Sequence, residues 1–107
     1  MKLYFYILET PYNKNSFVTF EECEVIENPK TYEPKDRFPR GVYNCYISKS
    51  DIGHISGYGN NIVVLTEPNS KLAKEIFTMV YESIVRRKEE SLAKAKTMLN
   101  AILEIEE

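Results

Sequence analysis

The residues best suited to recognising a charged ligand lie in the short stretch "DRFPRGVYNCY". Arg37 and Arg40 bracket a Phe-Pro pair, and Tyr43 follows in the same stretch. A guanidinium group matches the spacing of phosphate oxygens, and an aromatic ring can stack on a nucleobase. These residue types, close together in the sequence, indicate a candidate site for an anionic nucleotide.

The local charge pattern agrees with such a site. Residues 20–33 hold five glutamates and one lysine, whereas residues 35–49 hold four basic residues and one acidic residue. A second basic pair, Arg86 and Arg87, lies in the C-terminal segment. We expect one of the two arginine pairs to neutralise phosphates while a ring stacks on adenine; the candidate rings are Tyr43, Tyr58 and Phe77. The alternative is that all four arginines are surface charges paired with glutamates.

Catalytic and metal-binding motifs are missing from the sequence. It contains no G-x-S-x-G, Walker A, H-E-x-x-H or dinucleotide-binding pattern. A zinc site needs about four ligands, but the chain holds one histidine, His54, and two cysteines, Cys23 and Cys45. The glutamates between positions 21 and 27 are typical of a solvated strand edge. We therefore predict a protein that is not an enzyme, with no metal, no cofactor and two half-buried thiols.

Length and composition indicate one ordinary globular domain. The chain has 107 residues, and its 14 basic and 16 acidic residues leave a net charge of −2. That balance argues against a nucleic-acid polymer or an anionic membrane as partner. The longest apolar runs, such as "IVVL", are far shorter than the roughly 20 residues of a membrane helix. The N-terminal "MKLYFYILETPY" indicates a first strand rather than a signal peptide, so we expect a cytoplasmic location.

The first part of the chain predicts a small, mostly antiparallel sheet. The stretch "KLYFYILE" is apolar on both faces, which is typical of a central or doubly covered strand. It is followed by the turn sequence "TPYNKN", and the next strand should complete a hairpin. We predict four strands in all, at residues 2–9, 16–27, 42–48 and 62–66.

The connections between these strands differ in character. Three prolines interrupt residues 27–41 and predict an extended, semi-rigid loop. Residues 49–61 contain three of the four glycines and predict a loop or a tight hairpin.

A long helical segment follows at residues 68–107, because no glycine or proline occurs after Pro68. Thr66 or Asn69 can serve as the N-cap, and Pro68 suits the first turn if the helix starts at Thr66 or Glu67. One interpretation is a single helix of about 39 residues, near 58 Å in length. The other is a pair of helices with a kink or break near residues 86–91. The lack of any helix breaker favours a continuous helix or a kink.

The length of this helix has a consequence for assembly. Strands of six to eight residues span roughly 20–27 Å, so the sheet is too short to cover the whole helix. The outer part, "LAKAKTMLNAILEI", is apolar on one side. An apolar stripe of that size needs cover, either because the helix folds back on itself or because a second chain packs against it. We therefore predict a homodimer or larger oligomer assembled through residues 68–107, with residues 1–67 forming the β-rich part of a single domain.

Several segments support a resemblance to known proteins. The stretches "VIENPKTY", "KSDIG" and "VVLTEPNSKLAKEIF" resemble sequences in uncharacterised proteins of Firmicute prophages. In size and layout, the chain is similar to the phage family called Thoeris anti-defence protein one. Members of that family assemble through their helices and sequester cyclic ADP-ribose isomers made by bacterial TIR enzymes, without cleaving them. Some also hold cyclic oligonucleotides between subunits.

This resemblance implies a function but transfers no binding residue. It implies a phage anti-defence protein that acts in the host bacterial cytoplasm and sequesters a cyclic nucleotide-type immune signal. The alternative is a non-enzymatic phage accessory protein whose oligomer binds or inhibits a host protein. In either case, the expected fold is α+β, a four-stranded sheet followed by a long C-terminal helix or kinked helix pair that oligomerises.

Overall fold

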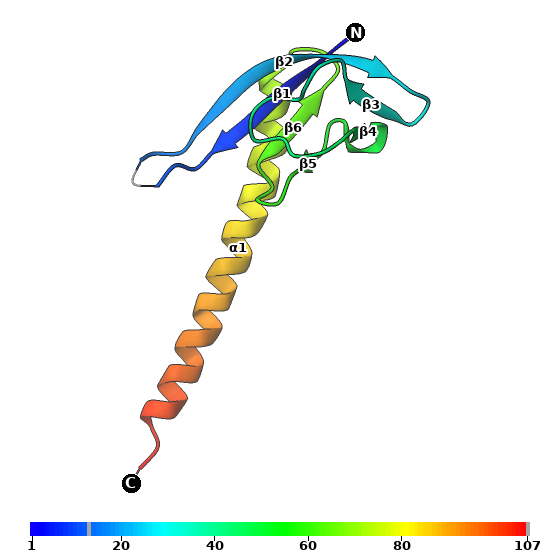
Figure 1. The fold of residues 1–107 in the computed structure, drawn as a ribbon. Helices are drawn as coiled ribbons and strands as arrows, with labels where there is room; N and C mark the ends of the chain where they lie inside the picture. Colours follow the sequence, from blue (N-terminus) through cyan, green and yellow to red (C-terminus); the bar gives the residue numbers. More distant parts are fainter. Residues whose placement is uncertain (13, 107) are drawn as a thin grey trace. The chain divides into compact units, whose positions relative to one another are not determined.

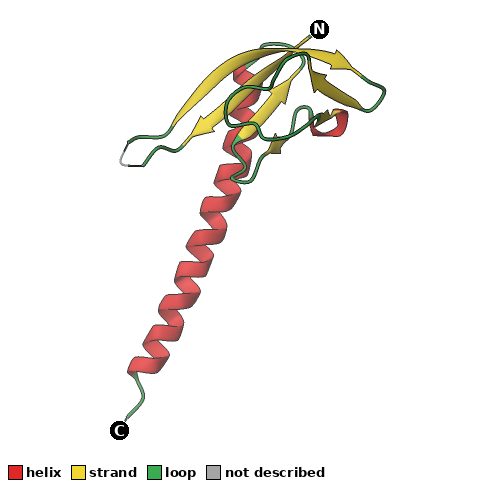
Figure 2. Cartoon of the chain, viewed as in Figure 1, coloured by secondary structure: helices red, strands yellow, loops and turns green. Residues whose placement is uncertain are grey.

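The protein is an α+β structure in which a curled antiparallel sheet is followed by one long helix (Figures 1 and 2). The computed structural model describes residues 1–12 and 14–106. The chain divides into two compact units, Met1–Phe77 and Thr78–Glu107. The predicted fold class and the C-terminal helix are confirmed at this level.

Six strands form the sheet in the described part of the chain, in the order β4-β3-β2-β1-β6-β5. All neighbouring strands are antiparallel. Their bounds are β1 Lys2–Glu9, β2 Phe17–Glu27, β3 Thr31–Pro34, β4 Ile47–Ser48, β5 Ile55–Ser56 and β6 Ile62–Leu65.

Strand β1 is central, as its two apolar faces predict. It pairs with β2 from Lys2 opposite Glu24 to Glu9 opposite Phe17. On its other side it pairs with β6, whose four residues are all buried. The predicted hairpin of β1 and β2 and the buried "IVVL" strand are therefore confirmed. One residue of the predicted turn between β1 and β2, Asn13, lies outside the described residues.

One face of the sheet carries the larger core cluster. Its buried members from β1 and β2 are Leu3, Phe5, Ile7, Cys23 and Val25. The chain between β3 and β4 covers this face and inserts Phe38. The result is a packed layer of irregular chain over the sheet, so the loop that carries the candidate arginines is anchored at its centre.

The opposite face packs against the start of the helix. The buried cluster here consists of Tyr6, Val63, Leu65 and Ala73, with Ile76 and Phe77 half-buried beside it. Phe20 of β2 lies over Tyr6 on this face, with ring centroids 5.1 Å apart. Because β1 is covered on both sides, its side chains from Leu3 to Leu8 are apolar on both faces.

The prediction of four strands was wrong. The proline-containing loop includes the short strand β3, and the glycine-containing loop includes β5 and a 3-10 turn at Lys49–Asp51. The strand predicted at residues 42–48 shrinks to β4, because the chain turns where the Val42 N–H donates to the Pro39 carbonyl. Gly41 adopts a φ of 95° at this turn. A strand of two residues is too short to show a hydrophobic periodicity, so β4 and β5 could not be predicted from the sequence pattern.

The C-terminal segment forms one continuous helix, α1, from Ser70 to Leu103. The two-helix interpretation is therefore wrong, and continuity holds because nothing in these 34 residues breaks the backbone ladder. Of the two predicted N-caps, Asn69 is the one used, so Pro68 lies before the helix rather than in its first turn. The Asn69 Oδ1 accepts a hydrogen bond from the Leu72 N–H at 3.0 Å.

The cap gives a first testable expectation. Asn69→Ala should lower the free energy of unfolding by about 1 kcal/mol, because one backbone donor of the first turn loses its acceptor. Asn69→Ser is the matched control, since a serine side chain also caps. Urea denaturation measures both variants. Equal losses for alanine and serine would contradict the capping role.

Candidate functional site

The loop that carries Arg37 and Arg40 is held against β2 by backbone and side-chain contacts. The Lys35 N–H donates to the Glu24 carbonyl at 3.0 Å. The Cys23 thiol donates to the Arg37 carbonyl at 3.4 Å. These bonds continue the sheet edge into the loop and keep the backbone at Arg37 in place.

Phe38 anchors the same loop on the side that faces the sheet. Its ring is buried and packs against Phe5, with ring centroids 5.7 Å apart. The ring between the two arginines therefore belongs to the core and is not available to stack on a ligand. Burying it leaves the exposed side chains of Arg37 and Arg40 on the outer surface of the loop.

The two arginines line one hollow of about 570 Å³. This volume lies in the range of small-molecule sites, about 300–1,000 Å³. The hollow also carries three carboxylates, and its full lining is Glu21, Glu22, Asp36, Arg37, Phe38, Pro39 and Arg40. Guanidinium groups suit phosphate oxygens, and carboxylates accept hydrogen bonds from hydroxyl or amino groups. A ligand for this hollow should therefore present both kinds of group.

The three acidic residues were not predicted as part of this site. The glutamates of β2 were interpreted as a solvated edge, and Asp36 is adjacent to Arg37 in sequence. Glu21 and Glu22 meet the loop only because β2 and the loop pack together, which the sequence does not reveal. The charge reversal between residues 20–33 and 35–49 was the one available signal, since opposite charges favour close approach.

The predicted aromatic partners lie outside this hollow. Tyr43 is 88% exposed in the chain after the Gly41 turn, and Tyr58 is fully exposed between β5 and β6. Phe77 is half-buried against the second core cluster. The structure therefore brings the loop arginines together with each other, but not with these three rings.

The second arginine pair lies on α1, and Arg86 lines a hollow there. Arg86 helps to line a hollow of about 390 Å³ along the helix, together with Thr78, Tyr81, Glu82, Val85 and Glu89. Arg87 is exposed and is not among the lining residues. Tyr81 was not predicted here, although the i, i+4 spacing from Tyr81 to Val85 would have indicated a shared face.

The two thiols differ in solvent exposure, although both were predicted to be half-buried. Cys23 is buried, whereas Cys45 is exposed. Burial raises the pKa of the Cys23 thiol above its ordinary value of 9.0, and the nearby carboxylates of Glu24, Asp36 and Glu21 raise it further. Cys45 is exposed because residues 42–46 form no strand and pack little against the core.

This difference predicts the behaviour of the native protein toward a thiol reagent. At pH 8 one thiol, Cys45, should react at once, and Cys23 should react only after denaturation. Because the folded state holds the Cys23 proton more tightly than the unfolded state, stability should fall as the pH rises above 9.0. Titration with a chromogenic disulfide, with Cys45→Ser as control, measures the first effect. Rapid reaction of two thiols in the native protein would contradict it.

Within residues 1–12 and 14–106, no three His, Cys, Asp or Glu side chains come close enough to hold a metal ion. No helix in the same part of the chain is long and apolar enough to cross a membrane.

Fold and site together define a small α+β protein with a mixed-charge hollow beside its sheet. Comparisons with protein families, with characterised proteins and with solved structures found no match to the chain.

Proposed function

We propose that this protein binds a small cyclic nucleotide-type signal and sequesters it without cleaving it. The ligand class is a cyclic ADP-ribose isomer or a cyclic oligonucleotide. The observation that carries the proposal is that the guanidinium-bearing residues Arg37 and Arg40 line one hollow of about 570 Å³. In this role the arginines neutralise phosphates, and no step of bond cleavage takes place.

The mixed charge of the hollow supports this ligand class over a simple anion. A cyclic nucleotide carries phosphates together with ribose hydroxyls and a base amino group. Arg37 and Arg40 suit the phosphates, whereas Glu21, Glu22 and Asp36 can accept hydrogen bonds from the hydroxyl and amino groups. A second chain would enclose a ligand that one small chain leaves open to water.

The biological setting rests on the resemblance to the Thoeris anti-defence protein one family. By that resemblance the protein is a phage anti-defence protein that lowers the free concentration of an immune signal in the host bacterial cytoplasm. Sequestration needs only tight binding at stoichiometric concentrations, which is compatible with a site built for contact rather than catalysis.

Calorimetry and thermal shift test the proposal directly. The purified protein is titrated with a panel of cyclic ADP-ribose isomers and of cyclic di- and trinucleotides. We expect at least one to bind with a dissociation constant below about 10 μM. Heat denaturation should then return that ligand chemically intact, which separates sequestration from hydrolysis. If no member of the panel binds with a dissociation constant below about 10 μM, the proposal is wrong.

A second candidate function is supported by the open edge of β2. Strand β3 pairs with β2 only over Val25–Glu27, so in the described residues the first part of β2 has a strand on one side only. The Val25 N–H donates to the carbonyl of Met1, which directly precedes β1, whereas the Glu24 carbonyl accepts from the Lys35 N–H on the opposite side of the strand. By alternation, the backbone groups of Val18 and Phe20 point outward. A strand of a host protein could pair there.

The two candidates give different results in a pull-down from host lysate. Capture of one stoichiometric host protein without bound nucleotide would favour the protein-binding function. That capture should be lost in Val18→Lys, which places a charge at the open edge. Thr19→Lys is the control, because the backbone of Thr19 faces β1.

A further inference from the structure

The outer part of α1 carries a seam of apolar residues, interrupted by one lysine, that repeats every three or four residues. Its members are Val85, Lys88, Leu92, Ala95, Leu99 and Ile102, the a and d positions of consecutive heptads. In the single chain Val85, Leu92, Leu99 and Ile102 are 53%, 56%, 54% and 61% exposed. Side chains of this size, in this spacing, are typical of a helix packed against another helix.

We propose that a second copy of this chain covers the seam, and that the two helices run antiparallel. The register is centred between Ala93 and Lys94. It places Val85 opposite the partner's Ile102 and Leu92 opposite the partner's Ala95. This inference concerns the helix alone and does not depend on nucleotide binding.

Lys88 is the first reason for the antiparallel direction. It occupies a d position, where the other members of the seam are apolar. In a parallel pair, each Lys88 would meet the partner's Lys88 in one layer, and two like charges would share a desolvated space. In the antiparallel register, Lys88 lies opposite the partner's Leu99. The two lysines are then about 16 Å apart along the axis.

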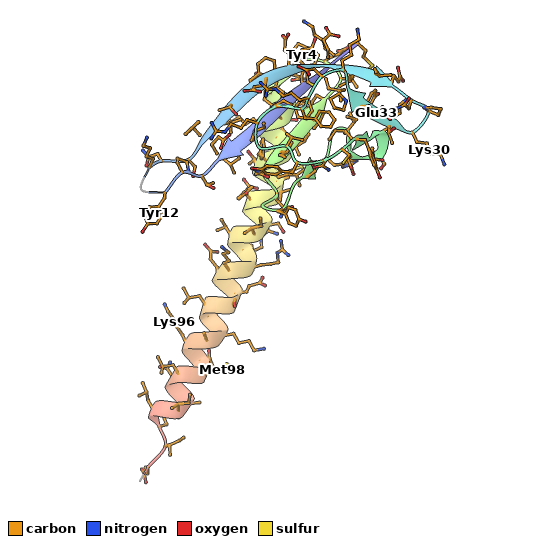
Figure 3. All side chains as sticks on the ribbon, in the orientation of Figure 1. Tyr4, Tyr12, Lys30, Glu33, Lys96 and Met98 are labelled. Carbon is orange, nitrogen blue, oxygen red and sulfur yellow. The ribbon has the colours of Figure 1, made fainter. Side chains whose placement is uncertain are left out.

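The charges that flank the seam give the second reason. Glu89 and Lys96 both occupy e positions, one on each side of the centre of the seam (Lys96 is labelled in Figure 3). An antiparallel pair brings Glu89 next to the partner's Lys96, and symmetry repeats this contact. A parallel pair would instead place Glu89 near Ile84 and Lys96 near Ser91, with no opposite charge. Charge complementarity therefore exists in one direction only.

The hollow on α1 gives the third reason. Val85, Glu82 and Glu89 line it, so it lies along the same face as the seam. In the antiparallel register, the partner's C-terminal turns lie against this hollow. Those turns are the most apolar part of the outer helix, with Met98 and Leu103 exposed beside the seam. The antiparallel register therefore packs the apolar C-terminal turns of one helix against the hollow that Val85 lines on the other helix.

The existence of the pair is tested by two lysine substitutions one residue apart. Leu99→Lys puts a charge in the seam and should raise the dimer dissociation constant by at least about a hundredfold. Asn100→Lys adds the same charge at an outward b position and should leave dimerisation unchanged. Light scattering and sedimentation at micromolar concentration measure both. A monomeric wild-type chain, or equal effects of the two substitutions, would overturn the proposal.

Charge exchange tests the proposed contact. Glu89→Lys and Lys96→Glu each place like charges opposite each other, so each should weaken the dimer by roughly two- to tenfold. The double variant restores opposite charges and should recover wild-type affinity. Additive weakening in the double variant would contradict the antiparallel register, because only that register pairs these two positions.

Spin labels measure the direction itself. Single cysteines at Lys94 and Ala101, in a Cys45→Ser background, occupy equivalent c positions. The antiparallel register predicts axial offsets of about 2 Å between labels at position 94 and about 22 Å between labels at position 101. A parallel pair would give the same distance at both positions. Equal distances would overturn the proposal even if the protein is dimeric and binds a nucleotide.

Discussion

Phe5→Ala should lower the free energy of unfolding by about 3–5 kcal/mol, the largest stability loss expected from a single truncation in this chain. Phe5 is completely buried, and its ring packs on Phe38, with centroids 5.7 Å apart. Removing the ring loses its transfer free energy and leaves a cavity that two paired strands prevent from closing. Urea or thermal denaturation, followed by circular dichroism, measures the change.

Phe17→Ala is the matched control for this prediction. It removes the same ring from the end of β2, where Phe17 is 51% exposed. We expect a loss of less than about 1 kcal/mol. Similar losses for the two phenylalanines would show that the face under the loop is not the main core.

The double variant Arg37→Ala/Arg40→Ala should weaken binding of the nucleotide found by calorimetry by at least about a hundredfold. Each charge-assisted contact contributes about 1.5–3 kcal/mol, or roughly ten- to a hundredfold in the dissociation constant. Both side chains are exposed and line the same hollow, so their loss should leave the fold intact. Isothermal titration calorimetry measures affinity, and thermal denaturation checks the fold.

Three further substitutions locate the site. Lys35 lies on the same loop but does not line the hollow. Lys35→Ala therefore removes one positive charge near the site and should change the affinity for the nucleotide little. Arg86→Ala and Arg87→Ala test the second arginine pair. Loss of binding in Arg86→Ala alone would move the site to the hollow on α1. Tight binding unaffected by any of the four arginine changes would keep the function and discard both sites.

Elements with a strong repeating signal were predictable from the sequence by itself. The apolar run within "KLYFYILE" and the run "IVVL" determined two inner strands, because a strand covered on both faces carries apolar side chains on both of them. The absence of glycine and proline after Pro68 determined a helix, and Asn69 was one of two predicted caps. The surplus apolar stripe on that helix was also visible, since its heptad spacing requires no knowledge of the fold.

Only the tertiary structure decided the composition of the candidate site. The sequence placed Arg37 and Arg40 near Phe38 and Tyr43, but the fold buries Phe38 against Phe5 and leaves Tyr43 exposed. It also brings Glu21 and Glu22 of β2 to the same hollow as the arginines. Short ladders such as β3, β4 and β5 depend on neighbours far along the chain, and two to four residues carry too little local preference to specify them. The site lies where these long-range contacts meet, so its lining depends on how the loop packs over the sheet rather than on the spacing of its residues.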